Sequence, residues 1–154
     1  MKKKLEFLLL ILIVLNCFAC EPATFYFDYE ELKENVVKIE LINYNNLDAK
    51  KINNEIEAIQ YFDFSKMEII ETLPGDKVEV FLRELSAYGL LLGEYCLDSP
   101  KGICIRIIYQ NGDFEVLGVK EEYGGTFEAN GNLKRFIAGG VGYVISNRFF
   151  ETQV

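Results

Sequence analysis

Carboxylates are the only abundant reactive side chains of this 154-residue chain, which contains no histidine. The lack of histidine excludes Ser-His and Cys-His catalysis and the zinc or copper sites that use imidazole ligands. A glycosidase needs two carboxylates that face each other across the substrate, about 5–9.5 Å apart, which sequence neighbours rarely provide. We therefore interpret the carboxylate pairs as solvated surface charge: Glu30-Glu31, Asp76 with Glu79, and Glu121-Glu122.

No other pattern in the sequence supplies catalytic groups. The serines lack the Gly-x-Ser-x-Gly context of a nucleophile elbow, and no acidic calcium-binding loop is present. We predict that the protein is not an enzyme, with no catalytic residue, no cofactor-binding residue and no metal ligand. An unrecognised carboxylate-based hydrolase remains the alternative from this class.

The first twenty residues, MKKKLEFLLLILIVLNCFAC, combine three lysines, an apolar run from Phe7 to Leu15, and a terminal Ala19-Cys20. A transmembrane helix needs about 20 apolar residues, whereas this run matches the roughly 7–15 residues of a cleaved signal. The segment resembles a bacterial lipoprotein signal peptide. That resemblance implies cleavage before Cys20 and attachment of acyl chains such as palmitate to it. Lipidation at Cys17, ordinary secretion and an uncleaved N-terminal anchor are the alternatives.

The resemblance predicts where the protein resides and how the chain is divided. We expect an extracytoplasmic protein, anchored by lipid to a bacterial membrane on its periplasmic or cell-surface side. Residues 1–19 are the expected signal peptide, and residues 20–35 are the lipidated cysteine with a short tether or the start of the fold. Residues 36–154 are the expected single globular domain.

An exported protein meets oxidising conditions in which disulfides persist. Cys96 and Cys104 flank a segment rich in turn-forming residues, including Pro100 and Gly102. We predict a disulfide between these two cysteines, which would contribute about 2–3 kcal/mol by closing a short loop. Two buried reduced thiols are the alternative.

The charge of the chain limits its partners. The net charge is −8, and the leader contributes three lysines and one glutamate, so the part from Cys20 onward carries −10. Such a surface disfavours nucleic acid, whose phosphates need basic patches. We predict a membrane-anchored, non-catalytic binding or interaction module, with an envelope or exported protein as its partner. The alternative is an inhibitor or immunity-type protein directed against an exported enzyme or toxin.

Hydrophobic periodicity predicts the elements. Val78, Phe81, Leu82 and Leu85 form one apolar stripe, which predicts a helix over residues 76–88 with Asp76 as its N-cap. Alternation predicts strands at residues 36–44 and 66–72. Two Asn-Gly turns predict hairpins, and the expected arms are residues 102–110 with 113–119, and residues 126–127 with 133–137.

The ends of the domain are less regular. Asp28 predicts the cap of a short helix over residues 28–35, and residues 143–150 are expected to form a last helix or an edge strand. Residues 47–62 follow no single period. The elements together predict an α+β fold: a mostly antiparallel sheet of four to six strands with one main helix, residues 76–88, packed on one face.

Overall fold

The computed structural model describes residues 24–45, 61–93, 102–120, 123–138 and 141–151. Within these ranges the chain forms eight β-strands, three α-helices and one short 3₁₀ helix. In chain order they are β1 (Thr24–Tyr26), α2 (Tyr29–Asn35), β2 (Val36–Tyr44), η2 (Phe64–Lys66), β3 (Met67–Thr72), α3 (Gly75–Ser86), β4 (Gly89–Gly93), β5 (Gly102–Tyr109), β6 (Phe114–Gly118), β7 (Tyr123–Phe127), β8 (Leu133–Ala138) and α4 (Val141–Phe149).

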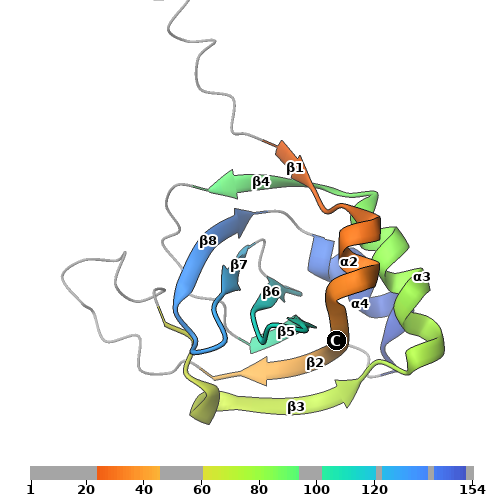
Figure 1. The fold of residues 1–154 in the computed structure, drawn as a ribbon. Helices are drawn as coiled ribbons and strands as arrows, with labels where there is room; N and C mark the ends of the chain where they lie inside the picture. Colours follow the sequence, from red (N-terminus) through yellow and green to blue (C-terminus); the bar gives the residue numbers. More distant parts are fainter. Residues whose placement is uncertain (1–23, 46–60, 94–101, 121–122, 139–140, 152–154) are drawn as a thin grey trace, which may run out of the picture.

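The strands form a single antiparallel sheet in the order β1-β4-β8-β7-β6-β5-β2-β3. Figure 1 shows this sheet as an open arc, with α2, α3 and α4 together on its open side. The α+β class and the antiparallel sheet are confirmed. The sheet has eight strands rather than the expected four to six. One of the unexpected strands is β4, which lacks a local sequence pattern and pairs with β1 and β8.

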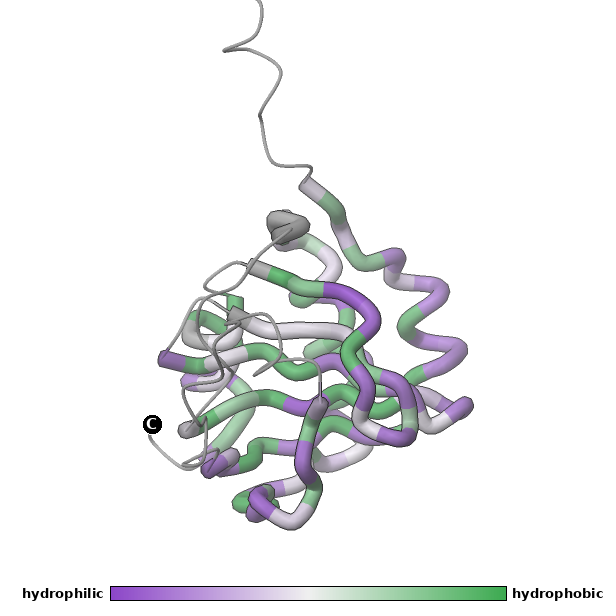
Figure 2. Tube along the Cα trace, turned by 90° about the vertical axis from the view of Figure 1, so that its left-hand side faces the viewer, coloured by the Kyte–Doolittle hydropathy of each residue, from purple (hydrophilic) through white to green (hydrophobic). Residues whose placement is uncertain are grey.

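Both faces of the sheet carry buried apolar side chains, because successive side chains of a strand point to opposite faces and each face packs against its own core. In Figure 2, hydrophobic stretches accordingly run along much of the chain, with hydrophilic residues between them. The helix-side core joins α2, α3 and α4 to residues such as Ile39, Leu41, Ile105 and Ile107. The aromatic core on the opposite face consists of Ile42, Tyr44, Phe62, Cys104, Phe114, Val116 and Phe127.

Helix α3 confirms the predicted main helix and buries Phe81, Leu82 and Leu85. Its predicted cap is wrong. Pro74 occupies the N-cap position without a side-chain hydrogen bond, and Asp76 already lies in the first turn. The helix starts one residue before Asp76, and a capping side chain must come from a residue that is still outside the helix.

Helix α2 begins as predicted. The Asp28 carboxylate accepts hydrogen bonds from the backbone N–H groups of Glu30 (2.9 Å) and Glu31 (3.1 Å). These bonds satisfy donors that lack partners within the helix. Residues 24–35 therefore belong to the fold as β1 and α2, and they are followed directly by β2.

The Asn111-Gly112 hairpin joins β5 to β6 as predicted. The Gly112 N–H bonds to the Tyr109 carbonyl at 2.9 Å, and Gly112 has a φ of +87°. Asn111 does not have positive φ, because glycines are the residues with positive φ in the described ranges. Asn111 instead accepts a hydrogen bond from the backbone N–H of Asp113 at 3.0 Å, and a single positive-φ residue completes the turn.

The C-terminal segment forms helix α4, which resolves the choice between a helix and an edge strand. The helix approaches β6 very closely at Gly142, where an added Cβ would lie 2.1 Å from the Gly118 carbonyl oxygen. Glycine is needed there because the two backbones meet. No helix among the described residues has both the length and the apolar character required to cross a bilayer.

Candidate functional site

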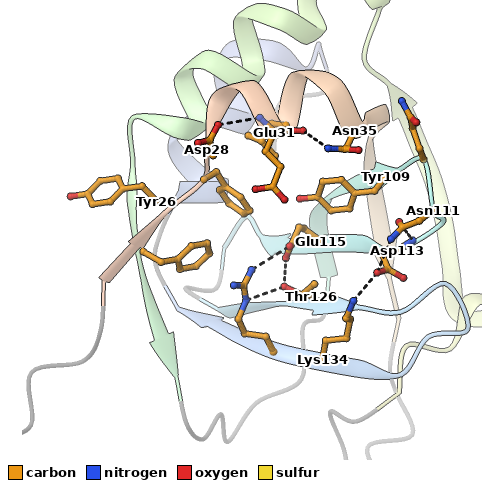
Figure 3. A pocket seen from close by; sticks show the side chains of 15 residues that line it. Tyr26, Asp28, Glu31, Asn35, Tyr109, Asn111, Asp113, Glu115, Thr126 and Lys134 are labelled. Atoms are coloured by element: carbon orange, nitrogen blue, oxygen red, sulfur yellow. Dashed lines mark hydrogen bonds and ion pairs between the residues drawn. The ribbon is translucent and has the colours of Figure 1, made fainter.

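A cleft of about 700 Å³ opens between the N-terminal elements and the sheet. One wall is formed by β1 and α2, and the opposite side by the β5–β6 hairpin together with β7 and β8 (Figure 3). Polar and aromatic side chains from both sides line it. They are Phe25, Tyr26, Phe27, Asp28, Glu31, Leu32, Asn35, Tyr109, Gln110, Asn111, Asp113, Glu115, Thr126, Lys134 and Arg135.

Glu115 lies at the base of this cleft and is 2% exposed. It alternates along β6 with Phe114 and Val116, which belong to the aromatic core, so its side chain is on the helix side of the sheet. The Thr126 hydroxyl donates a hydrogen bond to its Oε2 at 2.7 Å. Burial raises the pKa of Glu115 to about 7, although Thr126, Arg135, Lys134 and Tyr109 all favour the ionised form. A carboxyl group that titrates near neutrality is therefore available at the base.

The sheet register places Glu115, Thr126 and Arg135 side by side on three adjacent strands. Arg135 Nε donates to Thr126 Oγ1 at 3.3 Å, and its Nη2 lies 3.6 Å from Glu115 Oε1. The guanidinium also lies over the Phe25 ring, 4.4 Å from the ring centroid. Arg135 is thereby held by a carboxylate, a hydroxyl and an aromatic face, and it fixes β1 against β8.

Tyr109 also faces this carboxylate from β5. Burial raises the pKa of the Tyr109 hydroxyl, and the nearby Glu115 and Glu31 carboxylates raise it further, with Arg135 opposing them. The hydroxyl is protonated at neutral pH, so it can donate toward Glu115 while its oxygen remains able to accept a hydrogen bond from a ligand.

At the hairpin end, Lys134 and Asp113 form an ion pair with a separation of 2.8 Å. The hydrogen bond from Lys134 holds the pKa of Asp113 below its usual range. Asp113 also accepts bonds from Asn111 Nδ2 (3.1 Å) and from the backbone N–H of Ala129 (3.2 Å). The Asp113 carboxylate is thus largely occupied by partners within the protein.

Helix α2 supplies the remaining acidic groups. Asp28 caps the helix through one carboxylate oxygen. The Glu31 side chain points into the cleft toward the Tyr109 hydroxyl (Figure 3). No ion pair joins the Glu31 carboxylate to another residue among the parts of the chain that the structure describes. The interpretation of Glu31 as ordinary solvated charge is therefore incomplete, since this exposed carboxylate also lines the cleft.

A second polar cluster lies beside the aromatic core. Glu40 is fully buried and directly opposite Arg106 in the β2–β5 register. Arg106 Nε donates to Glu40 Oε2 at 3.0 Å, and the Lys38 ammonium lies 2.5 Å from Oε1. Burial raises the pKa of Glu40, but Lys38 and Arg106 outweigh it and hold the pKa below the usual value. The guanidinium also lies over Phe64 and Phe114. The cluster joins β2 to β5, and its Glu40 Oε1 has the Lys38 ammonium as a charge partner but accepts no hydrogen bond.

The candidate residues that the sequence indicated do not lie together in one site. Cys104 is buried in β5, and its Sγ lies 3.7 Å from the Gly102 carbonyl oxygen. Cys96, Cys17, Cys20 and the Glu121-Glu122 pair lie outside the described residues, so the disulfide and the lipidation site remain predictions. Glu79 accepts hydrogen bonds from Tyr29 and Arg83 on the surface, away from the cleft.

Sequence reasoning did not identify Glu115, Tyr109, Thr126 or Arg135 as a group. The available signal was Glu115 itself, a charged residue within the apolar run of residues 114–119. Among the described residues, no group of three or more cysteine, aspartate or glutamate side chains is arranged to hold a metal ion. The cleft offers hydrogen bonds, charge and aromatic faces to a ligand.

No protein-family model matches the chain, and no curated protein or solved structure was found to match it.

Proposed function

We propose that this protein is a membrane-anchored extracytoplasmic lipoprotein that acts as a non-catalytic binding module, with the cleft as its ligand site. The observation that carries the proposal is the convergence of Glu115, Tyr109, Arg135 and Glu31 on one cavity of about 700 Å³. Ligand sites commonly have volumes of about 300–1,000 Å³ and combine apolar walls with a few placed polar groups. Phe25 and Phe27 supply the apolar surface here.

The proposed anchor brings this cleft close to a membrane. Phe25, the first aromatic residue of the cleft, is five positions after Cys20. Five extended residues span at most roughly 17 Å. A ligand taken from the membrane surface, or from an envelope protein beside it, is within this reach.

Replacement of Cys20 tests the anchor. Cys20→Ala is expected to abolish metabolic palmitate labelling and to release the protein from membranes, whereas Cys17→Ala is expected to leave both unchanged. Palmitate retained in the Cys20→Ala protein would contradict lipidation at that residue.

A tryptophan in the cleft tests the binding site. Asn35 is an exposed cleft residue on α2, and Asn45 is an exposed residue outside the cleft at the end of β2. A panel of charged and neutral small molecules is screened by thermal shift against the lipidated chain in non-ionic detergent. We expect at least one compound to stabilise the wild-type and Asn45→Trp proteins but not Asn35→Trp. Equal stabilisation of all three, or of none, would contradict the assignment of the cleft.

A carboxylate-based hydrolase is the second candidate, because the buried Glu115 carboxyl has a pKa of about 7. A general acid works best when its pKa is near the working pH. Hydrolysis of a cleft-bound compound that disappears in Glu115→Gln and persists in Glu30→Gln would establish this candidate. Binding without turnover favours the binding module.

A further inference from the structure

We propose, resting on the binding function assigned to the cleft, that its ligand carries a positive charge. The structure assigns this position to a small organic cation, either an amine or guanidinium compound or the basic side chain of a peptide. The cation would lie between the Glu31 carboxylate, the Tyr109 hydroxyl and the aromatic wall formed by β1.

The charges already paired inside the cleft leave a negative excess. Lys134 pairs with Asp113 at 2.8 Å, and Arg135 faces Glu115 at 3.6 Å. Both basic residues lining the cleft therefore have an acidic partner, and Glu115, with a pKa of about 7, carries part of a charge at neutral pH. The acidic residues that remain on the lining are Asp28 and Glu31.

Of these two, Glu31 is better placed to contact a ligand. Asp28 uses a carboxylate oxygen to accept two backbone N–H groups at the start of α2. The Glu31 side chain extends into the cleft beside Tyr109 (Figure 3), and its charge contributes to the raised pKa of the Tyr109 hydroxyl. A cation at this position removes that repulsive field and supplies the Glu31 carboxylate with a partner.

The aromatic wall already accommodates a cation. The guanidinium of Arg135 lies 4.4 Å from the centroid of the Phe25 ring, a distance typical of a favourable cation–π contact. Phe25 and Phe27 are themselves in edge contact, with centroids 5.2 Å apart. The apolar part of an organic cation is expected to pack on this wall while its charged end reaches Glu31.

An anion is disfavoured at the same place. It would enter against Asp28 and Glu31 and approach the buried Glu115 carboxyl. Arg135 would have to exchange its contacts with Thr126 and Glu115 for contacts with the ligand. The charge of −10 from Cys20 onward, given a total of −8 and a leader with three lysines and one glutamate, also attracts cations over longer distances.

The test compares cationic, anionic and neutral probes. Butylamine, 1,4-diaminobutane, butylguanidine, butyrate, succinate and glucose are titrated by calorimetry into the full lipidated chain in non-ionic detergent at low salt. We expect the cations to bind and the anions and glucose not to bind. The Asn35→Trp protein provides the blocked cleft.

A matched pair of variants identifies the contact. Glu31→Gln and Glu30→Gln each remove one negative charge from α2, but Glu30 does not line the cleft. Loss of a charge-assisted contact is expected to weaken cation binding roughly tenfold or more in Glu31→Gln. Glu30→Gln is expected to change it by less than about twofold, because it alters only a screened long-range charge. Thermal unfolding of both variants checks that the fold is retained.

The outcomes separate this inference from the function on which it rests. Binding of butyrate, succinate or glucose that Asn35→Trp blocks, without binding of any cation, would overturn the cation assignment and leave the binding function intact. Equal weakening by Glu31→Gln and Glu30→Gln would overturn the assigned contact. Absence of binding by every probe would count against both the cation and the ligand-binding cleft.

Discussion

Two buried glutamates lie on opposite faces of one sheet, and their pKa values move in opposite directions. Burial raises the pKa of both Glu40 and Glu115. Glu40 is in direct contact with the cations of Arg106 and Lys38, which bring its pKa below normal. Glu115 has a hydroxyl donor at 2.7 Å and its cation at 3.6 Å, and its pKa rises to about 7. The number of nearby cations and their distance from the carboxylate decide the direction of the pKa shift.

The difference separates a structural group from a candidate functional one. In the Glu40 cluster both Glu40 and Arg106 are buried, and the half-exposed Lys38 covers the carboxylate. Glu115 is equally buried but lies at a cleft, next to a half-exposed Arg135. Ionisable groups with strongly displaced pKa values are enriched at functional sites, although structural ion pairs also displace them. Glu115 differs from Glu40 in its position at a cleft as well as in its raised pKa.

The largest expected effect comes from breaking the enclosed cluster. Arg106→Met leaves the Glu40 carboxylate buried without its guanidinium and is expected to lower the free energy of unfolding by about 3–5 kcal/mol. Urea denaturation measures the change. The double variant Glu40→Met with Arg106→Met is expected to recover most of the loss, because no buried charge remains and the Lys38 ammonium is half-exposed to solvent. A single-variant loss below about 1 kcal/mol would contradict a structural role for the pair.

The next effect is a dependence of stability on pH. The pKa of Glu115 is about 7 in the folded protein against 4.5 for the unperturbed group, so the folded state binds more protons between these values. The Glu115 contribution to stability is therefore complete below about pH 4.5 and is lost as pH rises through 7, by up to about 3 kcal/mol. Denaturation at pH 5 and pH 8 measures this component as the difference between wild type and Glu115→Gln.

Glu40 provides the opposite control. Its folded pKa is lowered, so its contribution is present above the normal glutamate pKa and is lost as pH falls below it. The difference between wild type and Glu40→Gln is expected to be the same at pH 5 and pH 8. The comparison would be reversed if the stability difference between wild type and variant changed with pH for Glu40→Gln and stayed constant for Glu115→Gln.

The smallest effect concerns the aromatic partners of the two arginines. The Arg135 guanidinium lies 4.4 Å from the Phe25 centroid, whereas Arg106 lies 5.9 Å from Phe64. A double-mutant cycle of Phe25→Leu with Arg135→Gln is expected to give a coupling of about 0.5–1 kcal/mol. The corresponding cycle of Phe64→Leu with Arg106→Met is expected to give a smaller coupling energy. A larger coupling energy for that pair would show that the distance from guanidinium to ring does not determine which contact is stronger.

Local chemistry made much of the fold predictable. Asp28 signals the start of α2 because a carboxylate can accept the first backbone N–H groups. Asn111-Gly112 signals a hairpin because glycine tolerates the φ of +87° that the turn uses. Strand β4 was missed because its partners, β1 and β8, lie about 65 residues before it and 45 residues after it, so pairing rather than local pattern defines it.

The cleft was beyond sequence reasoning for a related reason. A glutamate in an alternating strand normally faces solvent, and Glu115 is buried because α2 and β1 cover that face of the sheet. Glu31 was recognised as an acidic residue but interpreted as surface charge. Its position beside Tyr109 depends on how a helix near the N-terminus docks on strands that are more than 70 residues later.

Strand β1 is an edge strand joined to β4 through three residue pairs, Thr24–Leu91, Phe25–Leu90 and Tyr26–Gly89. Mechanical tension applied through the chain before Thr24 acts first on these pairs and on the contact between Phe25 and Arg135. Phe25 and Phe27 form part of the cleft wall. A pull of this kind would therefore widen the cleft before it strains the central strands, and the mechanical strength of β1 would determine how firmly the proposed ligand is held.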